Sequence, residues 1–421
     1  MTGDIVLAEY ADNRIELDIG DVAALERQTR GAFVIRRDLG GNAVIVNPRQ
    51  YVGVLSLPSG RRLSVAPKVL ATNLFLMLAI AYGLPTPFRD EPAAFADLDA
   101  VLEFLVVAFA RMVEERIVAG LHRSYVERED NLAAVRGRIV VAEDGRRNHV
   151  LRHRTWCRYA EFTWDIPENQ VIRQVAHLLA GWVREPRLRL RLWRIDHSLG
   201  EVSPTHVPVE AIDRFVYDRQ NRGYEPIHRL CRLFLRGSSL SEHAGETTFR
   251  TFLVDMNALF EAFVGQVLRE AAPAGMAVVE QDRGFLDRDG LLAIRPDILV
   301  TADGRPALVA DCKYKRQRAG EFIQHDVYQV LAYCTALGLD RGLIVYPRHE
   351  GGERGDLAIR NHDARIRVAA LDLGGEPADL QRACREFAGG VFAWAGRRAA
   401  PMEPQPGPRA SRPPHVPTGR A

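Results

Sequence analysis

Three lysines stand among the 56 basic residues of the chain, and two of them fall within Val309–Lys315. All other basic positions are arginine, so a retained lysine is expected to need a compact ammonium rather than a broad guanidinium fork. Asp311 and Lys313 are separated by Cys312 alone. Because alternate side chains of a strand share a face, Asp311 and Lys313 are predicted to point together, with Cys312 facing the opposite, apolar side.

A second carboxylate, Asp297, follows Pro296 and enters an apolar run, and a turn predicted at 303–306 lets the chain return beside it. Two carboxylates brought together this way suit Mg²⁺, with Mn²⁺ as a substitute. The metal would lower the pKa of a bound water, and Lys313 would orient that water or stabilise the transition state. The pattern predicts a Mg²⁺-dependent phosphodiesterase site with Asp297, Asp311 and Lys313 as catalytic residues. The alternative is an ordinary exposed hairpin.

Three further side chains are candidates for this site. Glu261, on a predicted helix at 252–270, is expected to be a further metal ligand, or else a solvated acid beside the apolar stripe of its helix. Gln329 and Tyr333 lie four apart on the next predicted helix and therefore share a face. Gln329 is predicted to position the phosphate or the attacking water, whereas packing is the alternative for Tyr333.

The third lysine, Lys68, has no acid partner visible in the sequence, and we infer only that it is a contact residue. The arginine-rich stretch 136–158 also contains Trp156 and fits a surface that follows a phosphate backbone. Because the whole chain favours arginine, an ordinary solvated surface explains this stretch equally well.

Composition sets outer limits on the class of protein. With 421 residues, 47% hydrophobic and 26% charged, the chain is expected to form two or three globular domains. The net charge of +2 does not by itself indicate a nucleic-acid partner. Five widely spaced cysteines favour a reducing cytoplasm over a disulfide framework, and no apolar stretch is long enough to span a membrane. No phosphate-binding loop is present, so nucleotide hydrolysis is not expected of this chain.

The elements that must position the site follow from periodicity. Residues 1–95 are predicted to be β-rich, with strands at 5–8, 14–17, 32–36, 44–46, 51–57 and 62–66. Residues 96–245 are predicted to be mainly helical, with helices at 98–118, from Pro167, at 207–217 and at 226–236. The polar segment 237–246 is predicted to be a linker.

Residues 246–398 are predicted to alternate helices and strands around a mixed sheet. Helices are expected at 252–270, 321–337 and 377–392, and strands at 277–280, 291–294, 298–301, 307–311, 341–346 and 365–371. The remaining segment, 399–421, is proline-rich and predicted to be disordered. The predicted fold is therefore multidomain α+β: a β-rich N-terminal domain, a helical middle region and a C-terminal α/β domain.

The ordered set Glu261, Pro296-Asp297, Asp311-Cys312-Lys313 and Gln329 resembles the PD-(D/E)xK nuclease superfamily. Further segments are similar to the McrC family, the nuclease subunits of McrBC 5-methylcytosine restriction systems. They are Tyr51–Val54, Val65–Lys68, Pro167–Gln170, Phe252–Glu261, Asp311–Lys315 and Asp326–Gln329. Members of that family commonly have alanine where this chain has Cys312. The backbone carbonyl of Cys312 could still ligate a metal.

The resemblance implies a DNA endonuclease subunit that cuts double-stranded DNA and stimulates GTP hydrolysis by a hexameric McrB-like AAA+ partner. It also implies that residues 1–95 bind that partner, that 246–398 form the PD-(D/E)xK domain, and that no membrane is involved. Two alternatives remain. The chain could be a non-cleaving activator and bridge of the motor ring, or a stand-alone DNA repair nuclease.

Overall fold

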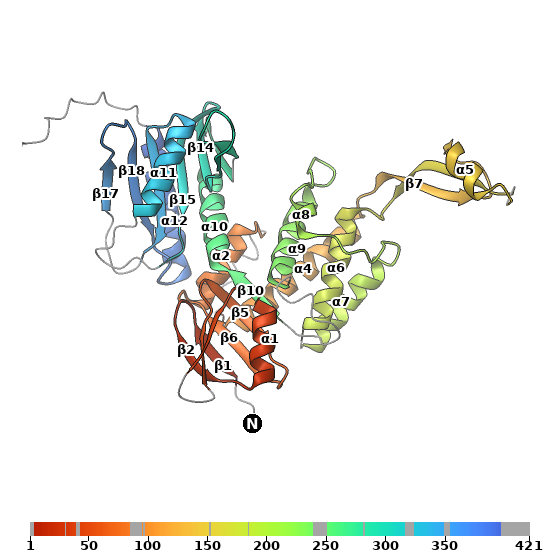
Figure 1. The fold of residues 1–421 in the computed structure, drawn as a ribbon, viewed down its shortest axis with the longest axis horizontal. Helices are drawn as coiled ribbons and strands as arrows, with labels where there is room; N and C mark the ends of the chain where they lie inside the picture. Colours follow the sequence, from red (N-terminus) through yellow and green to blue (C-terminus); the bar gives the residue numbers. More distant parts are fainter. Residues whose placement is uncertain are drawn as a thin grey trace, which may run out of the picture.

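The computed structural model describes residues 4–29, 31–38, 43–84, 95, 97–150, 153–183, 185–238, 251–280, 283–315, 324–348 and 354–396. The tail predicted at 399–421 and most of the predicted linker lie outside these residues. In Figure 1 a β-rich N-terminal unit lies at the base, with a sheet unit rising on one side and a helical unit on the other. The predicted mixture of α and β structure is confirmed.

The N-terminal unit contains two sheets, one ordered β1-β6-β5-β10 and the other β2-β4-β3. Its elements are β1 (Ile5–Ala8), β2 (Asn13–Glu16), α1 (Ile19–Thr29), β3 (Val34–Arg37), β4 (Ala43–Asn47), β5 (Tyr51–Ser56) and β6 (Arg62–Ala66). All six predicted strands are present within one or two residues of their expected bounds. Helix α1 was not predicted. It buries Leu25 against a core shared by both sheets, and its apolar positions are too few to give a clear helical period.

The helix predicted at 252–270 is wrong over its first residues. Thr251–Asp255 is strand β10, which pairs antiparallel with β5, and the helix α10 runs from Met256 to Ala271. Asp255 ends the strand by capping the helix, because its side chain accepts hydrogen bonds from the amides of Asn257 and Ala258. A strand from beyond the predicted boundary at 246 thus completes the N-terminal sheet.

Gly53 on β5 permits this pairing. A Cβ at Gly53 would lie 2.0 Å from the carbonyl oxygen of Phe252, far inside a van der Waals contact. Phe252 and Val254 are both buried in the large core that the helices share. The N-terminal sheet is therefore joined covalently and by packing to the helix α10 that follows it.

The helical unit consists of α4 (Leu98–Ala119), α6 (Pro167–Trp182), α7 (Pro186–Ser198), α8 (Val209–Ile212) and α9 (Glu225–Ser238), with the 3₁₀ turn η1 (Arg222–Tyr224). Three predicted helices are confirmed as α4, α6 and α9. The helix predicted at 207–217 shrinks to α8, because Pro208 starts it and the chain turns after Ile212. Helix α2 (Ala71–Ala81) packs against α10 and α4, and its residues Asn73 to Ala81 are all buried.

A long hairpin interrupts the helical unit and extends away from it (Figure 1). It is built from β7 (Ser124–Leu132) and β9 (Thr155–Thr163), with the short β8 (Arg138–Ile139) and helix α5 (Val141–Arg147) near its end. The sequence did not predict this hairpin. Asp165 fixes its base: one carboxylate oxygen accepts from Gln170 and the amide of Ser203, both at 2.8 Å, and the other from Arg128 at 3.0 Å.

Arginines in the stretch 136–158 are largely engaged within this hairpin. Arg136 lies 4.4 Å from the ring centroid of Tyr159, and Arg147 lies 4.3 Å from that of Trp156. Arg158 forms an ion pair with Glu129 at 2.5 Å. These contacts favour a structural use of the arginines, and contact with a phosphate backbone stays a prediction.

His228 on α9 supplies a pH-dependent contribution to stability. The ring is fully buried, with Nδ1 2.9 Å from the hydroxyl of Tyr217 and Nε2 2.9 Å from the carbonyl oxygen of Glu168. A carbonyl only accepts, so Nε2 carries the proton and Nδ1 accepts from Tyr217 in the neutral ring. Burial lowers the pKa of His228 to about 4.

We expect the contribution of His228 to the free energy of unfolding to be fully present above pH 6.5 and to be lost as the pH drops from 6.5 to 4. Over that range only the unfolded state binds a proton on His228. This lowers the free energy of unfolding by roughly 3 kcal/mol over the whole range. Between pH 7.5 and pH 5, the change in the free energy of urea unfolding should be about 2 kcal/mol more favourable to the folded state in His228→Gln than in the wild type. The exposed control His177→Gln should change as the wild type does. An equal change in all three proteins would contradict the assignment.

The sheet unit holds six strands of the described chain in the order β11-β14-β15-β16-β18-β17. They are β11 (Met276–Glu280), β14 (Ile298–Ala302), β15 (Arg305–Cys312), β16 (Arg341–Pro347), β17 (Arg354–Ala358) and β18 (Arg365–Leu371). Strands β15, β16 and β18 run parallel and the other pairs antiparallel, so the predicted mixed sheet is confirmed. A separate small hairpin, β12 (Gly284–Phe285) with β13 (Ala293–Ile294), precedes β14.

Helices cover both faces of this sheet. Helix α10 and helix α12 (Pro377–Ala395) share a core with alternate residues of β14 and β15, including Cys312. Helix α11 (Gln324–Leu337) packs against the other residues of the same strands, including Leu299 and Val309. The sheet is therefore the middle of three layers, and its α11 face is the one on which Asp311 lies.

No helix among the described residues is long and apolar enough to cross a membrane. The five cysteines are buried free thiols.

Candidate functional site

The strands β14 and β15 bring the two predicted carboxylates together. They pair antiparallel through a tight turn at Asp303 and Gly304, both of which have positive φ, so the predicted turn is confirmed. Ile298 pairs with Ala310, which places Asp297 opposite Asp311 at the same end of the sheet. One oxygen of Asp297 accepts a hydrogen bond from the amide of Cys312 at 2.7 Å.

Lys313 extends the site on the same face. Its ammonium lies 2.7 Å from one carboxylate oxygen of Asp311, and its amide donates to the carbonyl of Val345 at 2.9 Å. The side chain of Cys312 is buried in the core on the α10 face, as the alternation of the strand predicted. Asp311 and Lys313 therefore share a face that Cys312 does not.

Asp311 is a buried acid with few partners. Its side chain is only 1% exposed, and no group in the described part of the chain gives either oxygen a well-directed hydrogen bond. The 2.7 Å contact with Lys313 is an ion pair. Burial raises the pKa of Asp311, although Lys313 opposes the shift. A buried carboxylate with spare lone pairs is well suited to receive a cation.

Asp297 and Glu261 interact electrostatically although their elements lie in different layers. Burial, the charge of Glu261 and the charge of Asp311, in that order, raise the pKa of Asp297 to about 7. Lys313 and the amide of Cys312 act in the opposite direction. Three acids therefore compete for positive charge at one end of the sheet, and one lysine only partly neutralises them.

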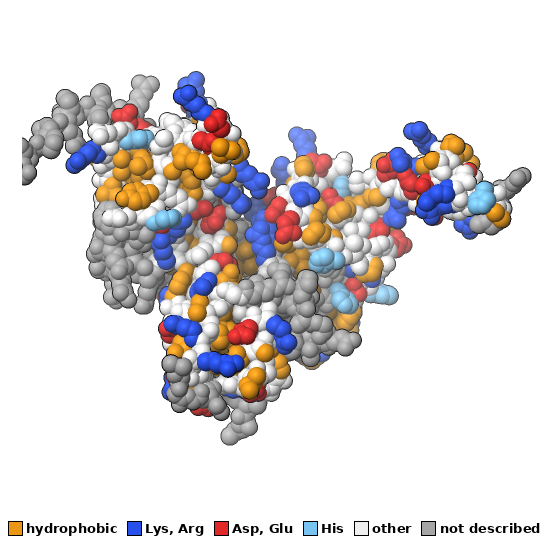
Figure 2. Space-filling view, viewed as in Figure 1, with side chains coloured by type: hydrophobic (Ala, Val, Ile, Leu, Met, Phe, Trp, Pro, Cys, Tyr) orange, Lys and Arg blue, Asp and Glu red, His pale blue; other side chains and the backbone are white. Residues whose placement is uncertain are grey.

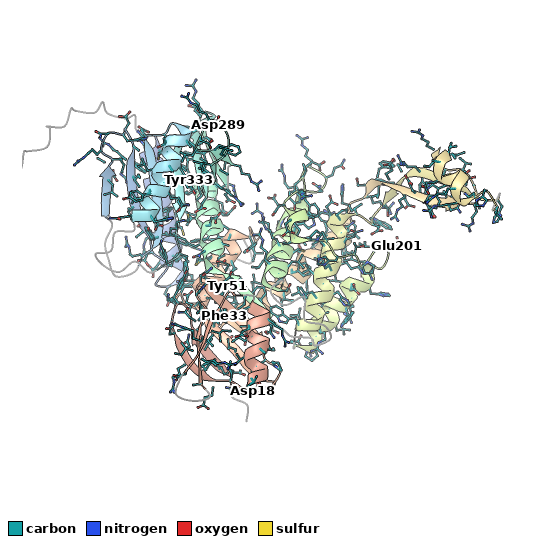
Figure 3. All side chains as sticks on the ribbon, in the orientation of Figure 1. Asp18, Phe33, Tyr51, Glu201, Asp289 and Tyr333 are labelled. Carbon is teal, nitrogen blue, oxygen red and sulfur yellow. The ribbon has the colours of Figure 1, made fainter. Side chains whose placement is uncertain are left out.

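Helix α11 contributes Gln329 and Tyr333, which the sequence predicted to share a face. The side-chain amide of Gln329 donates to the hydroxyl of Tyr333 at 2.6 Å, and that hydroxyl lies 3.3 Å from the carbonyl oxygen of Arg295. Figure 3 shows Tyr333 projecting from α11 within the sheet unit. The ring of Tyr333 is buried, so this residue both packs in the core and forms hydrogen bonds. The catalytic role of Gln329 stays a prediction.

A second acid–lysine pair beside the site was not predicted. Lys315 lies 2.8 Å from Asp326, whose carboxylate is 2% exposed and also accepts a hydrogen bond from the hydroxyl of Tyr346. The charge of Asp326 also contributes to the raised pKa of Asp311. The rarity of lysine pointed to Lys315, but nothing in the local sequence indicated that Asp326 would meet it.

The residues fit a divalent cation through a pair rather than a larger cluster. Among the described residues, no three His, Cys, Asp or Glu side chains are gathered closely enough to hold a metal. Mg²⁺ commonly binds one or two carboxylates and completes its shell with water and phosphate oxygens. Asp297 and Asp311 satisfy that requirement, whereas Glu261 and Cys312 stay predicted ligands.

The geometry defines the class as an α+β protein with a carboxylate–lysine site where the interior strands β14 and β15 of a mixed sheet meet at one end. Comparison with known proteins supplies the family. The sequence model of the McrBC family, described as a McrBC 5-methylcytosine restriction system component, matches residues 46–347. The chain belongs to this family, which confirms the predicted McrC relationship.

Two solved structures are similar to this chain, and the first of them supports the fold. One is a refined half-complex from a tetradecameric assembly of Thermococcus gammatolerans McrB AAA+ hexamers with bound McrC. It is 18% identical with a TM-score of 0.53, covering 92% of this chain and 100% of that chain. A cryo-EM structure of the Thermococcus gammatolerans McrBC complex is 20% identical with a TM-score of 0.41, over 64% of this chain and 88% of that one. No curated protein matches the sequence.

Proposed function

We propose that this chain is the DNA-cleaving subunit of a modification-dependent restriction system, cutting DNA by Mg²⁺-dependent hydrolysis of phosphodiester bonds. The observation that carries the proposal is the placement of Asp297 opposite Asp311, with Lys313 2.7 Å from Asp311 on the same face. The proposed fold of the sheet unit is that of PD-(D/E)xK nucleases. Membership of the McrBC family supports 5-methylcytosine as the modification.

The roles of the side chains follow from their charges and contacts. Asp297 and Asp311 would hold the metal, which supplies a more acidic bound water and a positive charge next to the phosphate. Lys313, on the same face as Asp311, would stabilise the charge that develops on the scissile phosphate. Gln329, which donates to the hydroxyl of Tyr333, would orient the phosphate or the water with its side-chain amide.

A partner protein is proposed from the comparison with a solved complex. The similar half-complex contains McrB AAA+ hexamers with bound McrC. We propose an equivalent hexameric GTPase for this chain, which has no phosphate-binding loop of its own. Stimulation of that GTPase by residues of the N-terminal unit is part of the proposal.

A second candidate function, as activator and bridge of the motor ring, is favoured by the projecting hairpin. Its side chains Tyr125 and Phe162 are exposed although their rings lie 5.1 Å apart, and it extends far beyond the helical unit (Figure 1). An arm of this kind offers a large surface to a partner. The two candidate functions are compatible, because the arm and the site lie on different units.

Cleavage of methylated and unmethylated plasmid, with and without the partner GTPase, GTP and Mg²⁺, tests the proposal. We expect cleavage of methylated DNA only when all components are present. Cleavage by the chain alone would favour an independent nuclease. A rise in GTP hydrolysis without cleavage, in wild type and Lys313→Ala alike, would leave the activator function and reject the nuclease.

A further inference from the structure

The third lysine of the sequence lies at the junction between the N-terminal unit and the sheet unit. The ammonium of Lys68 is 4.3 Å from the ring centroid of Tyr10, and the amide of Lys68 donates to a carboxylate oxygen of Glu9 at 2.8 Å. Strands β1 and β6 are parallel, so the loops that follow them, which contain Glu9 and Lys68, begin at the same end of the sheet. The sequence offered no partner for Lys68 because Glu9 is distant along the chain.

These loops contact the residue next to the site lysine at two points. The hydroxyl of Tyr314 donates to Glu9 at 3.0 Å, and the hydroxyl of Tyr10 donates to the carbonyl oxygen of Tyr314 at 2.7 Å. Both the side chain and the backbone of Tyr314 are therefore held by the N-terminal unit. Tyr314 follows Lys313 directly, so its backbone position limits where Lys313 can lie.

Apolar contacts alone could hold the two units together, without a buried carboxylate and its hydrogen bonds. Glu9 is 1% and Tyr314 3% exposed, and burying a carboxylate costs several kcal/mol that an apolar pair would avoid. Tyr10 adopts a φ of 54°, which costs a bulky residue about 1 kcal/mol or more. Hydrogen bonds are directional, so they fix the location of a backbone in a way that apolar contact does not.

We propose that Glu9, Tyr10, Lys68 and Tyr314 form a positioning cluster through which the N-terminal unit sets the placement of Lys313. The inference rests on the proposed nuclease function for its catalytic consequence. From the sheet, the amide of Lys313 is held by Val345 at 2.9 Å, and from the N-terminal unit the cluster holds the next residue. Displacement of the N-terminal unit would therefore move the backbone beside the site.

Amide hydrogen exchange tests the positioning directly, without any need for cleavage. The amide of Cys312 is bonded to Asp297 and that of Lys313 to Val345, so both report on this backbone. In Glu9→Gln and Tyr314→Phe we expect exchange at these two amides to rise about tenfold over wild type. Tyr217→Phe is the matched control, since it removes a tyrosine hydrogen bond to His228 inside the helical unit.

The overturning result is exchange at Cys312 and Lys313 that rises no more in the cluster variants than in Tyr217→Phe. Lys68→Met provides a milder change, because it keeps the length of the side chain and removes the charge above Tyr10. It should raise exchange at the same two amides by a smaller factor. An unchanged pattern in Lys68→Met and Glu9→Gln together would reject the cluster even if Tyr314→Phe failed to fold.

Single-turnover cleavage in the full assembly tests the catalytic consequence. Glu9→Gln and Tyr314→Phe should lower the maximal rate by about 10- to 100-fold, with the half-saturating DNA concentration unchanged, because a small misplacement of a catalytic group has that effect. Rates equal to wild type would overturn the inference. If the wild type itself does not cleave, the proposed function fails, and the exchange result alone decides the positioning.

Discussion

Replacing Asp311 by asparagine should lower the rate of Mg²⁺-dependent DNA cleavage by about a thousandfold or more. The change removes the anionic oxygens of a nearly fully buried carboxylate, and with them the charge that would hold the metal. Asp297→Ala and Lys313→Ala should have similar effects. Initial rates of plasmid linearisation, with the partner GTPase, GTP and Mg²⁺ present, are the measurement.

Two controls make this result specific to the site. Asp363→Asn changes an exposed acid on the turn between β17 and β18 and should cleave as the wild type does. Lys313→Arg keeps the positive charge but replaces a compact ammonium with a planar fork, so a loss of about 100-fold is expected. Cleavage that survives all three alanine or asparagine changes would reject the site.

The same substitution should not weaken the fold. Burial raises the pKa of Asp311, and within the described chain neither of its oxygens receives a well-directed hydrogen bond. A raised pKa means that the ionised carboxylate destabilises the folded state even with Lys313 beside it, so at neutral pH the urea midpoint of Asp311→Asn should equal or exceed that of the wild type. A site kept at the expense of stability is expected where the residue serves chemistry.

Gly53→Ala should lower the free energy of unfolding by about 3 kcal/mol, because the added methyl group would meet the carbonyl oxygen of Phe252. The backbone of β10 cannot move away easily, since Phe252, Leu253 and Val254 are all buried. Urea unfolding measures the loss.

Gly145→Ala is the control for this change. It lies in helix α5 with no atom within 4 Å of the added carbon, so stability should be unchanged or slightly higher. Equal stability of Gly53→Ala and wild type would show that β5 and β10 are not closely paired. Because β10 leads directly into α10, a genuine Gly53→Ala defect should also reduce cleavage.

Figure 2 shows how the described surface relates to these units. Lysine and arginine side chains gather on the face between the sheet unit and the helical unit, and acidic side chains are interspersed among them. The near-neutral net charge of the sequence therefore conceals a locally basic region. Such a region suits a DNA backbone and adds to the proposal of a DNA substrate.

The sequence by itself determined the local features of this protein. Alternation along a strand placed Asp311 and Lys313 on one face and Cys312 on the other, and the turn at Asp303 and Gly304 returned the chain beside Asp297. These relations span few residues and follow from strand geometry. The long amphipathic helices α4 and α6 were likewise predictable, because their apolar periodicity extends over several turns.

Only the tertiary structure decided which distant segments meet. Residues 251–255 read as the start of a helix, yet pairing with β5 beside Gly53 makes them a strand. Asp326 joins Lys315, and Glu9 joins Tyr314, through contacts that no local pattern encodes. The physical reason is that a buried polar group takes whichever partner the packing of separate units brings within hydrogen-bond reach, and sequence distance does not limit that choice.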